Sequence, residues 1–238
     1  MREVAYSLLE QPSGGVSGVP RVVSVISSIL QRLVTHNDIA GAAEDPQKLT
    51  VFHGLRAPSI GVDKYLERIF KYGNCSPSCF VVAYAYIDRF IAHYSAVSLT
   101  SLNVHRLLIT SIMVAAKFME DAYYNNAYYA KVGGISTVEM NRLELEFLFR
   151  VGFRLQVTVS AFENYCLHLQ REMVLSHGFQ VERPIIQYVW NFGANPNPNL
   201  NPNPNTLQDN KKLAQQQHDP QQHMQRVTKA LWQSYAGV

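Results

Sequence analysis

The chain has 238 residues, of which 47% are hydrophobic and 16% are charged, and its formal net charge is +3. This length predicts a single domain with tails, and the hydrophobic share is sufficient for a buried core. So small a net charge indicates neither a nucleic-acid partner nor a membrane surface. No apolar run reaches the roughly 20 residues that a membrane-spanning helix needs.

Residues 1–48 are predicted to form an N-terminal arm that contains one helix. Apolar residues recur at helical spacing between positions 22 and 33, which predicts an amphipathic helix over residues 20–36. Pro20 suits its first turn, because the N–H that proline lacks would have no helical partner there. This helix either packs against the domain that follows or helps to contact a partner.

Residues 49–175 have the pattern of an all-α domain, because amphipathic segments alternate with short connections and no strand-like alternation is present. Gly73 is expected to end the first helix in a left-handed conformation, and Ser76 and Pro77 to begin the second. Ser136 and Glu139 form a capping box before the fifth helix. Five helices and a further amphipathic segment are predicted at residues 61–72, from 77, from 100 or 101, within 123–129, at 137–153 and at 160–173.

The C-terminal extension, residues 176–238, has a different composition. From residue 194 it is dominated by asparagine, proline and glutamine, and it contains the run NPNPNLNPNPN. Proline at alternate positions removes backbone donors and excludes both a helix and a central strand. We therefore expect an all-α bundle with an N-terminal helix and a disordered C-terminal tail.

Lys117 and Glu144 interrupt apolar helix faces, where an unpaired charge is unfavourable. Lys117 lies near the carboxyl end of the third helix, which is apolar on nearly every side. It either extends its ammonium group to water or donates to carbonyl groups of a partner. Glu144 lies within the apolar face of the fifth helix, and either forms an internal or rim ion pair or accepts from donors of a partner.

Asp88 and Arg89 interrupt the apolar second helix within the sequence YIDRF. We expect both residues to be structural and to pair with charges on neighbouring elements.

The sequence contains no constellation that predicts catalysis or cofactor binding. HExxH, GxSxG, Walker A and GxGxxG motifs are absent. Cys75 and Cys79 form the one close cysteine pair, without a second pair or a histidine cluster, so we expect neither a metal ion nor another cofactor. Three cysteines and the lack of a secretory start predict an intracellular protein, in the nucleus, the cytoplasm or both.

Three segments in this order and spacing resemble a cyclin box over residues 51–174. They are SPSCFVVAYAYIDRF, LLITSIMVAAKFMED and MNRLELEFLFRVGFRL. The preceding segment PSIGVDKYLERIFKY favours a narrower resemblance, to the plant U-type cyclins, also called P-type, which are similar to fungal phosphate-sensing cyclins. The resemblance implies a single five-helix cyclin box, because too few residues follow for a second repeat.

The resemblance implies a regulatory subunit, not an enzyme, that forms a heterodimer with a cyclin-dependent protein kinase and stabilises its active conformation. Control of the cell cycle or a response to nutrients would follow. By motif, Lys117 and Glu144 match the family residues that bind the kinase backbone. The candidates for apolar kinase contacts, for which core packing is an equal interpretation, are Phe118, Met119, Leu148 and Phe149.

The chain also departs from the family pattern. The arginine that pairs with the aspartate at Asp88 has no counterpart near Pro58 or Ser59, so Arg89 or Lys64 is expected to supply the donor. The substrate-docking motif of mitotic cyclins is not recognisable in SIGVDKYLER. An alternative function is a cyclin-fold interaction module for a non-kinase partner; an enzyme is disfavoured by the missing catalytic constellation.

Overall fold

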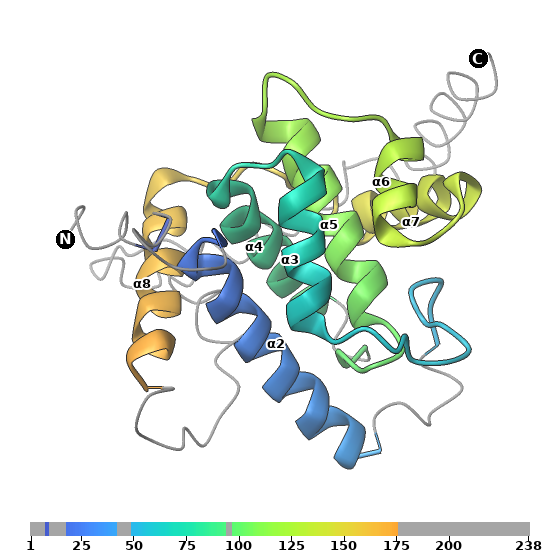
Figure 1. The fold of residues 1–238 in the computed structure, drawn as a ribbon, viewed down its shortest axis with the longest axis horizontal. Helices are drawn as coiled ribbons and strands as arrows, with labels where there is room; N and C mark the ends of the chain where they lie inside the picture. The colour runs from blue at the N-terminus through green and yellow to red at the C-terminus, as the bar shows by residue number, and fades with distance from the viewer. Residues whose placement is uncertain (1–7, 10–17, 42–48, 94–96, 176–238) are drawn as a thin grey trace, which may run out of the picture. The chain divides into compact units, whose positions relative to one another are not determined.

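The computed structural model describes residues 8–9, 18–41, 49–93 and 97–175 of the chain (Figure 1). These residues form seven α-helices and no strand, which confirms the predicted all-α class. The C-terminal tail and its predicted disorder lie outside the described residues, and the predicted division into arm, box and extension stays a prediction. The helices are α2 (Arg21–Ile39), α3 (Val62–Gly73), α4 (Pro77–His93), α5 (Val104–Met119), α6 (Asn126–Gly133), α7 (Thr137–Arg150) and α8 (Val159–Leu175).

The pair α4 and α5 forms the centre of the described region. Residues 79–88 of α4 and 107–116 of α5 are all buried, and the two helices make the most extensive helix–helix contact. A helix that is apolar all round has to be covered on every side. The remaining helices supply that cover: α3, α6 and α7 pack on α5, whereas α2, α7 and α8 pack on α4.

Helix α2 packs as a core helix against α3, α4 and α8, with seven of its residues buried. In Figure 1 it lies in blue between the orange α8 and the cyan α3. Arg32 on α2 donates to Glu172 on α8 at 2.6 Å, and the ring of Tyr84 on α4 stacks on His168 of α8. Helices α2 and α8, which lie before and after residues 49–150 in the chain, are therefore in direct contact. No helix among the described residues has the length and apolar character needed to cross a membrane.

Several helix ends differ from the prediction by a few residues. Helix α6, expected within residues 123–129, spans Asn126–Gly133, and α7, expected to reach residue 153, ends at Arg150. The left-handed residue after α3 is Asn74, with φ 49°, whereas Gly73 is the last residue of the helix. Asparagine tolerates this conformation, and a Cβ on Gly73 would lie 3.3 Å from the Cys75 sulfur. Helix α5 begins at Val104 because the Asn103 side chain accepts from the backbone N–H of Thr100 and holds a turn ahead of it.

Only one of the two hydrogen bonds of the predicted capping box forms before α7. Ser136 Oγ accepts from the backbone N–H of Glu139 at 3.1 Å, as predicted. The Glu139 carboxylate, however, accepts from Arg106 Nε on α5 at 2.7 Å. The residue expected to complete a local cap instead connects α7 to the central helix.

Three fully buried phenylalanines form an aromatic cluster beside the central pair. Phe90 on α4 stacks on Phe147 of α7, with ring centroids 5.6 Å apart and planes inclined by 6°. Phe52, from the segment before α3, meets Phe90 edge-on at 5.1 Å. This cluster fastens α7 and the connecting segment to α4, because stacked and edge-on rings add to the stabilisation from apolar burial.

Phe90→Ala should lower the free energy of unfolding by about 3–5 kcal/mol, because it removes a fully buried ring and leaves a cavity. Phe118→Ala is the control, since 53% of the Phe118 surface is exposed. We expect it to change the free energy of unfolding by less than about 1 kcal/mol. Urea denaturation of both variants measures the difference. Equal effects would contradict the assigned cluster.

Candidate functional site

Three helices meet where α5 leaves the core. Lys117 lies in the last turn of α5, Asn126 is the first residue of α6, and Glu144 lies in the middle of α7. Each of these helices packs on the other two. Two polar residues predicted from separate helices are thus brought together, and a third, Asn126, joins them.

The three side chains form a closed ring of hydrogen bonds. Lys117 Nζ lies 2.7 Å from Glu144 Oε1 and also donates to Asn126 Oδ1. Asn126 Nδ2 donates to Glu144 Oε2 at 2.6 Å and to Asn141 Oδ1 at 2.8 Å. Each oxygen of the Glu144 carboxylate therefore accepts from a different residue, and the negative charge is compensated within the chain.

Burial differs between the two charged members. The Glu144 side chain is 8% exposed, which agrees with its predicted position in the apolar face of the fifth helix. The Lys117 side chain is 24% exposed, so its ammonium group stands at the edge of the core. Of the two interpretations of Glu144, the internal ion pair is therefore present, and the ammonium group still reaches the surface.

Apolar side chains surround this ion pair on both helices. Phe118 and Met119 follow Lys117 and are 53% and 42% exposed. Leu148 and Phe149 are half-buried and lie one turn beyond Glu144 on α7; Leu148 also packs against the core. Exposed aromatic and thioether side chains beside a partly buried charge pair are typical of a protein-binding surface.

Asp88 has a partner that the sequence did not predict. It is buried, and its Oδ2 accepts from the hydroxyl of Tyr165 on α8 at 2.6 Å. The expected donors lie elsewhere: Lys64 pairs with Glu67, and Arg89 donates to the carbonyls of residues 154 and 156. The prediction of Arg89 or Lys64 as donor is thus wrong, because no local pattern in the sequence indicates that α8 packs on α4.

Burial strongly affects the acidity of Asp88. Desolvation raises the pKa of its carboxyl to about 7, against the weaker lowering effects of the Tyr165 hydroxyl and the Arg89 charge. Its Oδ1 has no hydrogen-bond partner among the described residues. Asp88 and Tyr165 therefore connect α4 to α8 at a position where a carboxylate is unfavourable. Its partner Tyr165 belongs to α8, whereas the ring of Lys117, Asn126 and Glu144 is built from α5, α6 and α7.

The other polar features have local partners. Cys79 Sγ and the N–H of Ser76 both donate to Glu120 Oε1, which ties the start of α4 to the end of α5. Within the described residues no cluster of three histidine, cysteine or acidic side chains could hold a metal ion. Sequence motifs did not indicate Asn126; the one available signal was two adjacent asparagines before a short helix.

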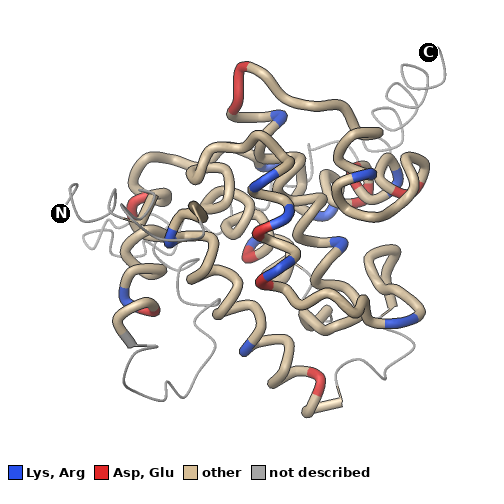
Figure 2. Tube along the Cα trace, in the orientation of Figure 1, with Lys and Arg blue, Asp and Glu red and all other residues tan. Residues whose placement is uncertain are grey.

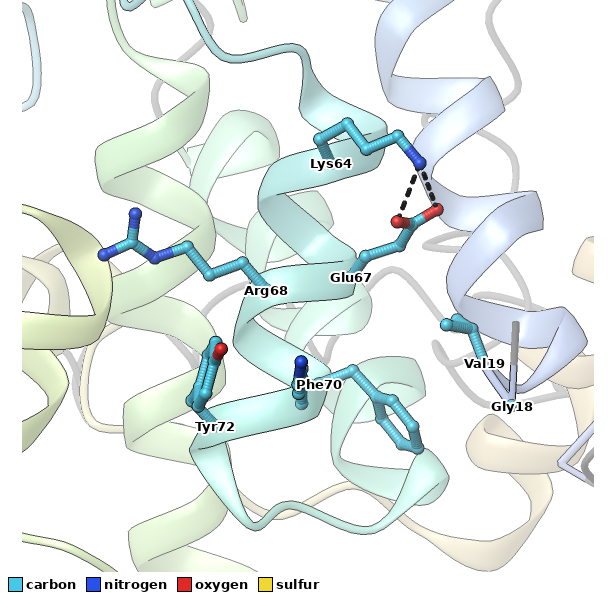
Figure 3. Close-up of a pocket in the computed structure, with 8 residues that line it drawn as sticks. Gly18, Val19, Lys64, Glu67, Arg68, Phe70 and Tyr72 are labelled. Atoms are coloured by element: carbon cyan, nitrogen blue, oxygen red, sulfur yellow. Dashed lines mark hydrogen bonds and ion pairs between the residues drawn. The ribbon is translucent and has the colours of Figure 1, made fainter. Parts of the chain in front are cut away.

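A surface hollow beside α3 is a weaker candidate (Figure 3). It is lined on α3 by charged and aromatic side chains that already have partners. Lys64 pairs with Glu67, Arg68 donates to the carbonyl of Lys131, and Lys71 lies over the ring of Tyr72. Acidic and basic positions alternate along this helix (Figure 2), so the hollow presents no field of a single sign. We therefore place the candidate site at Lys117 and Glu144.

Asp88→Asn should stabilise the protein at high pH and have little effect at low pH. Between about pH 4 and pH 7 the folded protein keeps a proton on Asp88 that the unfolded chain has released. The free energy of unfolding of the wild type therefore falls as pH rises through this window. The advantage of the variant should grow to at most about 4 kcal/mol at pH 8. Urea denaturation at about pH 4.5 and about pH 8, near the two ends of this window, measures the difference in free energy of unfolding between variant and wild type. A difference independent of pH would contradict this assignment.

Comparison with known proteins supplies the family context. The family model described as Cyclin matches residues 20–155. Cyclin-U4-1 of Arabidopsis thaliana is 56% identical over 168 residues, which cover 70% of this chain and 81% of that protein. Cyclin-P4-1 of Oryza sativa subsp. japonica is 54% identical over 65% of this chain and 75% of its own length. Cyclin-U2-1 of Arabidopsis thaliana is 48% identical over 78% and 83%.

Proposed function

The chain belongs to the cyclin family, and on this premise we propose that it binds and activates a cyclin-dependent protein kinase. Cyclins are regulatory proteins, so the chain acts on the reaction of a partner. The observation that carries the proposal is the ion pair between Lys117 and Glu144 at the end of α5, bordered by exposed apolar side chains. The resemblance to U-type and P-type cyclins supports a role in cell-cycle or nutrient-linked control.

The ion pair is better explained by binding than by stability. A largely buried ion pair contributes little net stability, because desolvation offsets much of the attraction. An ammonium group has three N–H donors. Two are used by Glu144 and Asn126, and the third has no acceptor among the described residues. A backbone carbonyl of the kinase would accept from this third donor, and the buried Glu144 would hold the ammonium group in place for that contact.

Apolar side chains would provide most of the contact energy. Phe118 and Met119 expose large apolar surfaces next to Lys117, and burying them in a complex removes that surface from water. A few such anchors commonly dominate the affinity of a protein interface. Leu148 and Phe149 are less exposed and contribute from α7 at the margin of the same surface.

Activation then follows from a difference in affinity. A kinase that exchanges between an inactive and an active conformation is shifted only by a partner that binds the active one more tightly. A rigid surface built on α5 and α7 would select the conformation whose backbone groups match Lys117 and Glu144. A shift from mostly inactive to mostly active, 1:99 to 99:1, requires roughly 10⁴-fold tighter binding to the active conformation.

Replacing both charges should remove kinase binding without unfolding the protein. We expect Lys117→Ala/Glu144→Ala to weaken affinity for the cognate kinase at least about 30-fold, equivalent to about 2 kcal/mol. Lys64→Ala/Glu67→Ala is the matched control, because it removes an ion pair of the same residue types from the exposed face of α3 (Figure 3). Phosphate transfer to a generic substrate by a panel of monomeric cyclin-dependent kinases, together with calorimetric binding, measures both variants.

The outcomes of this experiment separate the two candidate functions. Stimulation of one kinase that is lost in the Lys117/Glu144 variant alone supports the proposal. Binding without stimulation would indicate an adaptor on the same fold. Neither binding nor stimulation across the panel would favour an interaction module for a non-kinase partner. Equal losses in both variants would show that the contact surface is placed wrongly.

Phe118→Ala should weaken kinase affinity about tenfold, because it removes an apolar anchor from the proposed surface. Leu55→Ala is the control: Leu55 is fully exposed, and its neighbour Gly54 donates to the carbonyl of Leu102 at the opposite end of α5. We expect this control to bind as the wild type does. Surface plasmon resonance with immobilised kinase gives both affinities, and a larger loss for Leu55→Ala would refute the proposed orientation.

A further inference from the structure

We infer that Asn126 is a positioning residue that holds Lys117 and Glu144 in the geometry a kinase recognises. This inference rests on the proposed kinase-binding function. The side chain of Asn126 lies between the two charged groups and contacts both of them. It is the one described side chain that hydrogen-bonds both the ammonium group and the carboxylate.

The chemistry of the ring requires an amide at this position. Its oxygen accepts from Lys117, and its NH₂ group donates to Glu144 and Asn141. The reversed amide would set an NH₂ group against an ammonium group and an oxygen against a carboxylate, and both contacts are repulsive. A carboxylate here would repel Glu144, and an apolar side chain would leave the buried Glu144 Oε2 without its donor.

The amide also determines which donors Lys117 presents outwards. Because Asn126 occupies Glu144 Oε2, the ammonium group binds only Oε1. Without Asn126, both carboxylate oxygens would become accessible to the ammonium group on its long, flexible stem. The lysine would then turn further towards Glu144 and away from the surface. The third side chain of the ring therefore keeps one lysine donor directed at a partner.

Helix α6 is a rigid support for this amide. The short helix is anchored to the end of α3, because Tyr129 donates to the carbonyl of Gly73 and Tyr128 to that of Tyr72. The preceding residue, Asn125, caps the helix by accepting from the backbone N–H of Tyr128. Capping and bridging are thus performed by two adjacent asparagines, which leaves the Asn126 side chain available for the ring.

These adjacent residues provide a matched pair of variants for the full chain. Asn126→Ala removes the bridge, and Asn125→Ala removes the cap of the same helix while leaving the ring intact. We expect Asn126→Ala to weaken affinity for the cognate kinase about tenfold and Asn125→Ala less than about twofold. Both variants should lower the melting temperature of the free protein. Asn126→Asp, which retains the acceptor but not the donor, should lose at least as much affinity as Asn126→Ala.

A thermodynamic cycle tests whether Asn126 acts through the lysine. In the Lys117→Ala background, Asn126→Ala should cause little further loss of kinase affinity, because the group that it positions is already gone. A full additional loss there, or equal losses for Asn126→Ala and Asn125→Ala, would overturn the inference. The wild type is measured first: if it binds no kinase, the proposed function fails and the inference fails with it. If the Lys117→Ala/Glu144→Ala variant binds the kinase as tightly as the wild type does, both the site and the inference are wrong, although the proposed function stands.

Discussion

The burial of α5 on all sides is the constraint on which the rest of the domain depends. Residues 107–116 have no polar face to turn towards water, so the helix folds only if other helices enclose it. The surrounding helices accordingly pack on α5 or on its partner α4. The enclosure ends at the last turn of α5, where Lys117 follows the buried residues and brings a charged side chain to the edge of the core.

The candidate site lies where the end of α5 leaves the core. Helix α5 ends, α6 begins and α7 passes at the same place, so polar groups from all three helices meet at the edge of the core. Glu144 is tolerated in an apolar face because Lys117 and Asn126 supply donors to both of its oxygens. The same arrangement joins recognition to folding, because the groups proposed to contact a kinase also fasten α5, α6 and α7 to one another.

Local patterns in the sequence predicted much of this structure. Apolar periodicity indicated the approximate extent of the described helices except α6, which was expected within residues 123–129 and spans 126–133. Ser136 marked the start of α7, because capping acts within one turn. Burial of Lys117 and Glu144 at helix faces was also predictable. The partners were not, because they come from distant segments: Tyr165 lies 77 positions after Asp88 in sequence. Nor does composition distinguish Asn125 from Asn126, whose tasks differ only through the direction in which each side chain leaves the helix start.

The contacts of α8 show that the packed core extends beyond the region matched by the cyclin family model. The family match ends at residue 155, before α8 begins. Yet Tyr165, Cys166 and Leu169 of α8 are buried against the domain, and Glu172 holds Arg32 of α2. A chain cut at the limit of the match would expose part of α4 and leave Asp88 facing water. The segment after the family match therefore covers part of α4 and belongs to the same core.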